Sequence, residues 1–251
     1  MQCPKVAVFD VDDTLAESFQ APKPEMLLRL ARLLECIPVA IISGAGFSRI
    51  NDGFLVPLEK TPHIRRLIVL PNSSAQAYTW ADGWNEEYNL SLSADEKRQI
   101  KIAFAQASED LPLIHDTKQY GERIADREAQ IAFTVVGLDA PQDIKMGWDP
   151  GAAKRRIIRD YLLKKLPEFD IRTGGASTID VTHRGINKSY GVRWLSEKLK
   201  ISPGDMLYVG DALYEGGNDA VVISTGIQTR SVTGPAETAI VIDELLSVCR
   251  A

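Results

Sequence analysis

The chain has 251 residues, of which 45% are hydrophobic and 25% are charged, and its net charge at pH 7 is -5. The length is enough for one large α/β domain, or for a core with a smaller inserted domain, and the composition is that of an ordinary globular protein. Because a nucleic-acid-binding surface is normally basic, we expect no nucleic-acid partner. No apolar run is long enough for a signal peptide or a membrane span, so we expect no membrane association.

The three cysteines, Cys3, Cys36 and Cys249, lie far apart in the sequence. Their number is odd and no Cys-x-x-Cys spacing occurs. This pattern predicts neither a disulfide nor a zinc site, and it indicates a reducing, cytoplasmic environment.

Strand and helix patterns alternate over the first seventy residues. Residues 5–10 predict a buried strand, and residues 24–35 predict a helix with its leucines on one side. Two more short apolar runs, at 39–42 and 66–70, predict further buried strands. Continuous apolar strands separated by helices are typical of a parallel sheet.

The pattern changes near Tyr78, where antiparallel signals begin. We expect a hairpin at 78–85 around Asp82-Gly83, a helix from Ser93 with a capping box, a strand at 130–136, a helix from Asp149, and a strand at 178–181. Residues 78–184 are therefore predicted to form a separate α+β domain.

The α/β alternation returns after residue 184. A helix is expected from Asn187 and Lys188, a strand at 205–210, and short strands at 221–224 and 240–242. The simplest interpretation is a Rossmann-like α/β core of residues 1–77 and 185–251, interrupted by the inserted domain.

Two carboxylates, Asp10 and Asp12, directly follow the first strand. Ligands bind at the carboxyl ends of the strands in an open parallel sheet. In this position Asp10 is suited to attack phosphorus and form an aspartyl-phosphate. Asp12 is suited to protonate the leaving oxygen and then to activate water.

Other polar residues follow later strands or open a helix. Candidates for binding a phosphate are the Ser43 hydroxyl, the Gly44 amide, Lys188 and Asn218. Candidates for binding Mg²⁺ are the carboxylates of Asp10, Asp12, Asp211 and Asp219, with Asp219 expected behind the direct ligands.

These motifs, in this order, resemble the haloacid dehalogenase (HAD) superfamily. The matching segments are Asp-x-Asp-x-Thr at 10–14, Ser43 after a strand, Lys188, and Gly-Asp…Asn-Asp at 210–219. The length of the insert resembles the C2B type of cap, found in sugar-phosphate phosphatases and eukaryotic-type phosphomannomutases. The resemblance implies a Mg²⁺-dependent enzyme that acts on a small phosphorylated substrate.

The insert matches the mutases only in part. Arg127 corresponds to the first of their cap arginines, and Thr178 and Asp180 correspond to a Ser-x-Asp pair that holds the substrate. The second arginine falls at Leu138, and the third at Lys145, which keeps the charge without the bidentate fork.

Phe19 also stands near the place where the mutases carry an arginine after the first motif. The fewer cations favour a sugar-phosphate phosphatase over a phosphohexomutase, which must bind a bisphosphate in two orientations; the mutase stays as the alternative. A phosphoacceptor domain like a response regulator lacks such an insert, and a non-catalytic binding protein would not need Asp10, Asp12, Asp211 and Lys188 all to be present. The oligomeric state is open, with a homodimer as one option.

Overall fold

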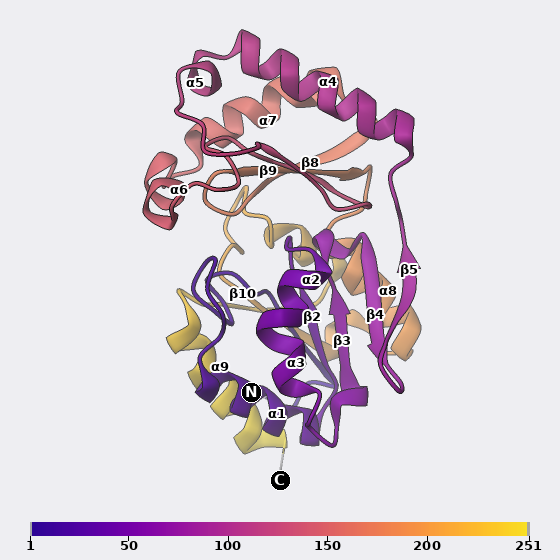
Figure 1. Cartoon of the computed structure of the whole chain (residues 1–251). Coiled ribbons are helices and arrows are strands. Elements are labelled where there is room, and N and C mark those ends of the chain that lie inside the picture. Colours follow the sequence, from indigo (N-terminus) through magenta and orange to yellow (C-terminus); the bar gives the residue numbers. More distant parts are fainter. Residues whose placement is uncertain (1, 250–251) are drawn as a thin grey trace. The chain divides into compact units, whose positions relative to one another are not determined.

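The computed structural model describes residues 2–249 and shows the expected α/β architecture (Figure 1). The described chain divides into two compact units. One contains the residues up to Asn89 and those from Asn187 onward, and the other is Leu90–Ile186. No helix among the described residues is both long enough and apolar enough to cross a membrane.

The first unit is built on a seven-stranded sheet in the order β11-β10-β1-β2-β3-β4-β5. Five strands run parallel: β11 (Gln228–Ser231), β10 (Met206–Gly210), β1 (Val6–Phe9), β2 (Val39–Ile42) and β3 (Leu67–Leu70). The last two, β4 (Gln76–Trp80) and β5 (Trp84–Asn89), are antiparallel. Four of the parallel strands, β10, β1, β2 and β3, are apolar and buried because both faces of the sheet are covered there, whereas the edge strand β11 is polar and exposed.

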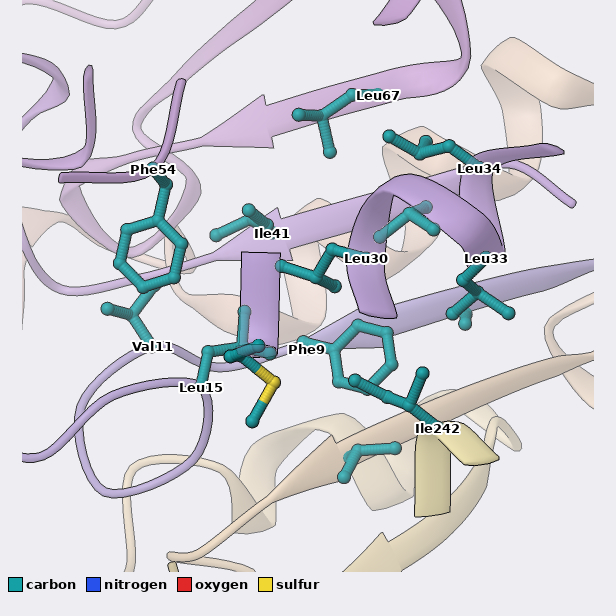
Figure 2. Packing of buried hydrophobic residues seen from close by; sticks show 14 of the residues in the cluster. Phe9, Val11, Leu15, Leu30, Leu33, Leu34, Ile41, Phe54, Leu67 and Ile242 are labelled. Carbon is teal, nitrogen blue, oxygen red and sulfur yellow. The ribbon is translucent and has the colours of Figure 1, made fainter. Parts of the chain in front are cut away.

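Helices cover each face of this sheet. On one face, α1 (Pro24–Cys36) packs beside α9 (Pro235–Cys249); on the other lie α8 (Lys188–Leu199) and the 3₁₀ segment η5 (Ala220–Thr225). Successive side chains of a strand point to opposite faces. Phe9 therefore packs with Leu30 of α1 and Ile242 of α9 (Figure 2), while Val8 joins the cluster under α8.

A helical segment with a π-helical centre follows β2. It consists of α2 (Phe47–Ile50), the π-helix η1 (Asn51–Leu55) and α3 (Val56–Leu58). Short π-helical stretches inside helices often occur at functional sites. Three 3₁₀ turns complete this unit: η2 (Ile64–Arg66), η3 (Asn72–Ser74) and η4 (Pro203–Asp205).

The second unit contains a four-stranded antiparallel sheet in the order β6-β7-β9-β8. Its strands are β6 (Ile124–Asp126), β7 (Ile131–Thr134), β9 (Thr178–His183) and β8 (Phe169–Gly174). Its helices are α4 (Ala94–Asp110), α5 (Pro112–His115), α6 (Gln142–Trp148) and α7 (Ala153–Lys165). The apolar side chains of one sheet face pack against α4 and α7, and α4 begins with the expected capping box of Ser93 and Glu96.

The hairpin at 78–85 does not open the inserted domain, as the sequence suggested. Its strands β4 and β5 extend the sheet of the first unit, because Ile68 and Val69 of β3 pair with Thr79 and Tyr78. The boundary therefore falls between Asn89 and Leu90, after the hairpin. A hairpin pattern predicts the pairing of its own strands, but not which sheet the pair will join.

Two expected strands are helical instead. Residues 221–224 lie in the 3₁₀ segment η5, and residues 240–242 lie inside α9. In α9 the buried positions Thr238, Val241, Ile242 and Leu245 have helical spacing, which outweighs the β-propensity of the branched residues. The helix expected from Asp149 begins at Ala153; the Asp149 carboxylate still accepts hydrogen bonds from the amides of Lys154 and Arg155.

The structure also corrects the prediction that no disulfide forms. Cys3 and Cys249 are disulfide-bonded, with their Cα atoms 5.1 Å apart, and Cys36 is free. Cys3 precedes β1 and Cys249 ends α9, and side chains of β1 and α9 belong to the same apolar cluster. Spacing could not show this, because 246 positions separate the two residues. The cysteines therefore no longer support the expectation of a reducing, cytoplasmic environment.

Candidate active site

The candidate site begins where β1 ends, in the middle of the seven-stranded sheet. Asp10 directly follows β1 and is 4% exposed. Phe9 pairs with Ile41 of β2 and with Val209 of β10. Ser43 and Asp211 follow those two strands. This register therefore places them beside Asp10, at the carboxyl ends of the parallel strands.

Lys188 brings two carboxylates together. Its Nζ lies 2.7 Å from Oδ1 of Asp10 and 2.6 Å from Oδ1 of Asp219, and the residue is only 1% exposed. Asn187 caps the helix by accepting a hydrogen bond from the Ser189 amide, so Lys188 is the first residue of α8. A buried lysine is tolerated here because carboxylates surround its charge.

Asp219 is held by three donors. Besides Lys188, the Tyr208 hydroxyl donates to Oδ1 at 2.5 Å, and the backbone amide of Ala212 donates to Oδ2 at 3.1 Å. A carboxylate with both oxygens occupied in this way is suited to orient Lys188. It is less suited to be a direct metal ligand than to lie behind the direct ligands.

Three carboxylates and one lysine leave an excess of negative charge at this site. Oxygen atoms of Asp10, Asp211 and Asp219 lie within 4.8 Å of one another. Burial raises the pKa of Asp10 well above its usual value; Lys188 opposes the rise, and Asp219 and Asp211 add to it. Burial and the Asp219 charge raise the pKa of Asp211 to about 6. Burial alone would lower the pKa of Lys188, but Asp10 and Asp219 raise it overall.

The donor set fits a magnesium ion. Mg²⁺ prefers hard oxygen ligands, and a divalent ion would offset the negative charge that Lys188 leaves unbalanced. Asp211 accepts a hydrogen bond from the Thr14 hydroxyl, which fixes its carboxylate. The buried Oδ1 of Asn218 has no hydrogen-bond partner among the residues that the structure describes, and an acceptor of this kind suits a cation or a donor.

Ser43 follows β2, and its side chain is almost fully buried. Its hydroxyl oxygen accepts a hydrogen bond from the Ala45 amide at 3.0 Å. A hydroxyl that accepts one hydrogen bond can still donate its proton. The turn from Ser43 to Gly46 also leads into α2, so the Ser43 hydroxyl and the Gly44 amide belong to one tight loop.

Asp12 is not part of the three-acid cluster. Its carboxylate instead pairs with the guanidinium of Arg49 in α2 and accepts a hydrogen bond from the Phe19 amide. Arg49 is not recognisable from the sequence as a partner of Asp12. One arginine on a short helix carries no recognisable motif, and only the fold brings it to Asp12.

The inserted unit brings three of its four candidate residues to one face of its sheet. Thr178 and Asp180 share the β9 face opposite the apolar core, and the Thr178 hydroxyl lies 3.1 Å from that of Thr134. Arg127, just after β6, lies 4.0 Å from Asp180. Lys145 lies in α6 and donates to the Leu138 carbonyl at 2.7 Å.

The relatives found by comparison with known proteins include several phosphomannomutases. No family model matches the chain. Phosphomannomutase of Spinacia oleracea is 28% identical over 245 residues, which cover 93% of this chain and 92% of that protein. Phosphomannomutase of Schizosaccharomyces pombe is 24% identical, with 98% of this chain and 96% of that protein covered.

Two solved structures share the fold. IMP-nucleotidase of Plasmodium falciparum superposes with a TM-score of 0.71 at 16% identity, covering 97% of this chain and 68% of that one. The C-terminal domain of C. albicans trehalose-6-phosphate phosphatase superposes with a TM-score of 0.67 at 14% identity, covering 98% and 93%.

The fold, the acidic cluster and these relatives resemble those of HAD-type enzymes of phosphoryl transfer. Within that class the chain resembles the phosphomannomutases and the sugar-phosphate phosphatases.

Proposed function

We propose that the chain is a Mg²⁺-dependent phosphatase that hydrolyses a small phosphorylated metabolite, a sugar phosphate, through an aspartyl-phosphate on Asp10. The observation that carries this proposal is the position of Lys188 between the buried carboxylates of Asp10 and Asp219, with Asp211 beside them. A cation and a metal-binding acid next to a carboxylate nucleophile supply what phosphoryl transfer needs, which is positioning and charge neutralisation.

The reaction proceeds in two steps. An Oδ atom of Asp10 bonds to phosphorus while the bond from phosphorus to the leaving oxygen breaks, and Asp12 gives that oxygen a proton. Water then attacks the phosphorus of the aspartyl-phosphate and passes a proton to Asp12. This second step frees Asp10 and inorganic phosphate.

The other site residues bind and orient the phosphate. Lys188 lies against Asp10, where it would offset the negative charge of the phosphoryl oxygens. Ser43, Gly44 and Asn218 would contribute donors. Asp10 and Asp211 would hold Mg²⁺, with Asp219 orienting Lys188 behind them; when bound, Mg²⁺ supplies further positive charge at the phosphoryl group.

The inserted unit, Leu90–Ile186, is proposed to select the substrate. Its sheet face with Arg127, Thr178 and Asp180 offers a cation, a hydroxyl and a carboxylate, which together suit the anionic and hydroxyl groups of a sugar phosphate. Lys145, the fourth candidate, lies in α6, where its amine donates one hydrogen bond to the Leu138 carbonyl and keeps the positive charge that suits an anionic group.

A phosphohexomutase is the second candidate, and it is favoured by the relatives, which are named phosphomannomutase and match over nine-tenths of their length. A mutase must hold a second phosphate firmly. The apolar Leu138 and Lys145, which keeps its charge without a bidentate fork, stand where the mutases carry cap arginines, and this weaker grip on a second phosphate weighs toward hydrolysis.

The deciding experiment incubates the protein with Mg²⁺ and hexose 1- or 6-phosphates, with and without a hexose 1,6-bisphosphate. Phosphorus NMR then separates inorganic phosphate from an isomerised sugar phosphate. Release of inorganic phosphate without need for the bisphosphate supports the phosphatase. Isomerisation that depends on the bisphosphate would replace it with the mutase, and no turnover of any phosphate ester would refute both.

A further inference from the structure

Both Nη atoms of the Arg49 guanidinium bind the carboxylate of Asp12. Nη2 lies 2.5 Å from Oδ1 of Asp12, and Nη1 lies 3.2 Å from Oδ2. The Arg49 side chain is 40% exposed and that of Asp12 is 25% exposed. A bidentate fork fixes the plane of a carboxylate as well as its position, which a single hydrogen bond does not do.

Phe19 completes this arrangement. Its amide donates to Oδ1 of Asp12 at 3.2 Å, and its ring lies under the guanidinium, with Cζ of Arg49 5.4 Å from the ring centroid. The loop between Asp12 and Phe19 is itself tied down, because Asp13 accepts hydrogen bonds from the amide and the hydroxyl of Ser18. Asp12 is therefore held from two sides.

The guanidinium also borders a pocket of about 500 Å³ in the first unit. The loop after β1 contributes Phe19 and Gln20 to its wall, and the helical segment after β2 contributes Ser48, Arg49 and Phe54. Arg49 thus belongs to the wall of a cavity beside the candidate site, and its fork spans the two segments that follow β1 and β2.

We propose that Arg49 is the positioning residue for Asp12 in both proton transfers. This inference rests on the proposed function, in which Asp12 is the general acid and then the base. The acid step converts the Asp12 carboxyl into a carboxylate as its proton moves to the leaving oxygen. The base step starts from that carboxylate, which accepts a proton from the attacking water.

The bidentate contact of Arg49 suits the ionised form of Asp12 that exists between the two steps. It stabilises the carboxylate that forms when the proton leaves, and it keeps that carboxylate oriented until water arrives. The pair adds little to folding stability, since partly exposed ion pairs contribute little. Its effect is therefore expected in the rate of the reaction and not in the stability of the fold.

Leaving-group dependence separates this role from two others. A phosphate ester with a basic leaving group, such as a sugar phosphate or phenyl phosphate, needs a proton from Asp12. Dinitrophenyl phosphate does not, because its leaving group departs as a stable anion. A residue that grips the substrate phosphate would change KM for both esters, and a structural residue would change the rate of both.

The test compares Arg49→Gln and Arg49→Lys with an Arg65→Gln control. Arg65 pairs with Asp82 on the surface of the same unit, where the side chains are 70% and 97% exposed. Rapid mixing measures the rate at which Asp10 is phosphorylated by each ester, and thermal unfolding confirms that the variants are folded. General acid catalysis contributes about 10²- to 10⁴-fold, so loss of its positioning should lose a part of this.

With phenyl phosphate, Arg49→Gln should phosphorylate roughly 10- to 100-fold more slowly, with little change in KM. With dinitrophenyl phosphate the rate should change by less than about threefold. Arg49→Lys should lie between Arg49→Gln and the unaltered protein, and Arg65→Gln should match the unaltered protein. In an Asp12→Asn background, Arg49→Gln should cause no further loss of the phosphorylation rate, since both substitutions impair the same proton transfer.

Three outcomes would each overturn the role of Arg49. The phosphorylation rate could fall equally with both esters, only KM could change, or the loss of rate could be additive in the Asp12→Asn background. These failures differ from failure of the proposed function. If Asp10→Asn keeps full turnover, the aspartyl-phosphate route itself is refuted. If Asp10→Asn is inactive while Arg49→Gln acts equally on both esters, only the inference about Arg49 is refuted.

Discussion

The Nζ of Lys188 lies 2.7 Å from Oδ1 of Asp10, although 178 positions separate the two residues in the chain. Asp10 follows a central strand, and Lys188 is the first residue of a helix that packs on that sheet. Both side chains are buried, so each charge depends on the other and on the neighbouring carboxylates.

Replacing Asp10, the proposed nucleophile, should abolish turnover. We expect Asp10→Asn to reduce Mg²⁺-dependent hydrolysis of an aryl phosphate by roughly 10³-fold or more, because an amide is a poor nucleophile toward phosphorus. Mass spectrometry of the quenched enzyme should also lose the phosphorylated peptide that contains position 10. Asp82→Asn, at an exposed position, is the control. A phosphorylated peptide elsewhere in the chain would contradict the assignment.

Removing Lys188 should affect both activity and stability. Lys188→Met leaves the buried carboxylates of Asp10 and Asp219 without their cation, so the metal-free protein should lose about 3 to 5 kcal/mol of unfolding free energy. Lys198→Met is the matched control on the same helix, where the partner Glu87 is partly exposed; it should cost less than about 1 kcal/mol. Denaturant unfolding measures both. Equal effects of the two substitutions would argue that the buried cluster is not charged.

Magnesium binding should weaken at low pH. The pKa of Asp211 is raised to about 6 by burial and by Asp219, and that of Asp10 is raised as well. Without metal, the native state binds protons more tightly than the unfolded state. The resulting stabilisation is complete below the usual Asp pKa and is lost as the pH rises through about 6.

Magnesium should reverse this trend, because it would bind the ionised carboxylates. Added Mg²⁺ should therefore raise the melting temperature at about pH 7.5 and have little effect at about pH 5. Thermal unfolding with and without Mg²⁺ at the two pH values checks this expectation. Asp211→Asn should remove the Mg²⁺ effect at both. A pH-independent Mg²⁺ shift would contradict the site.

The disulfide should stabilise the fold. Cleaving the bond between Cys3 and Cys249 should lower the unfolding free energy by about 2 to 4 kcal/mol, because the bond closes almost the whole chain into a loop. Thiol titration of the unfolded protein should find one reactive cysteine before reduction, Cys36, and three after it. Cys36→Ser is the control for stability. Three free thiols in protein purified without reductant would contradict the pairing.

The face of the inserted sheet should affect specificity rather than chemistry. Arg127→Ala should raise KM for a sugar phosphate by about 10-fold, the equivalent of one charge-assisted hydrogen bond, and leave KM for a small aryl phosphate nearly unchanged. Arg98→Ala, an exposed position on α4 of the same unit, is the control. Equal changes for both esters would remove Arg127 from substrate recognition.

Periodicity predicted the central elements well where one face, or both, had to be apolar. The buried runs at 39–42 and 67–70, and the helix that begins at Lys188, have the expected type and nearly the expected bounds. It failed where short apolar runs are ambiguous. The run at 240–242 looks like a strand in isolation, but it is one turn of α9.

The sequence by itself determined which residues could carry phosphoryl-transfer chemistry. Asp10, Ser43, Lys188 and Asp211 were identifiable because each stands at a strand end or a helix start, where the parallel-sheet pattern gathers ligands. Only the tertiary structure decided the remaining partners. Arg49 reaches Asp12, and Cys3 reaches Cys249, through packing between elements that are distant in the chain, and such contacts leave no local pattern to read.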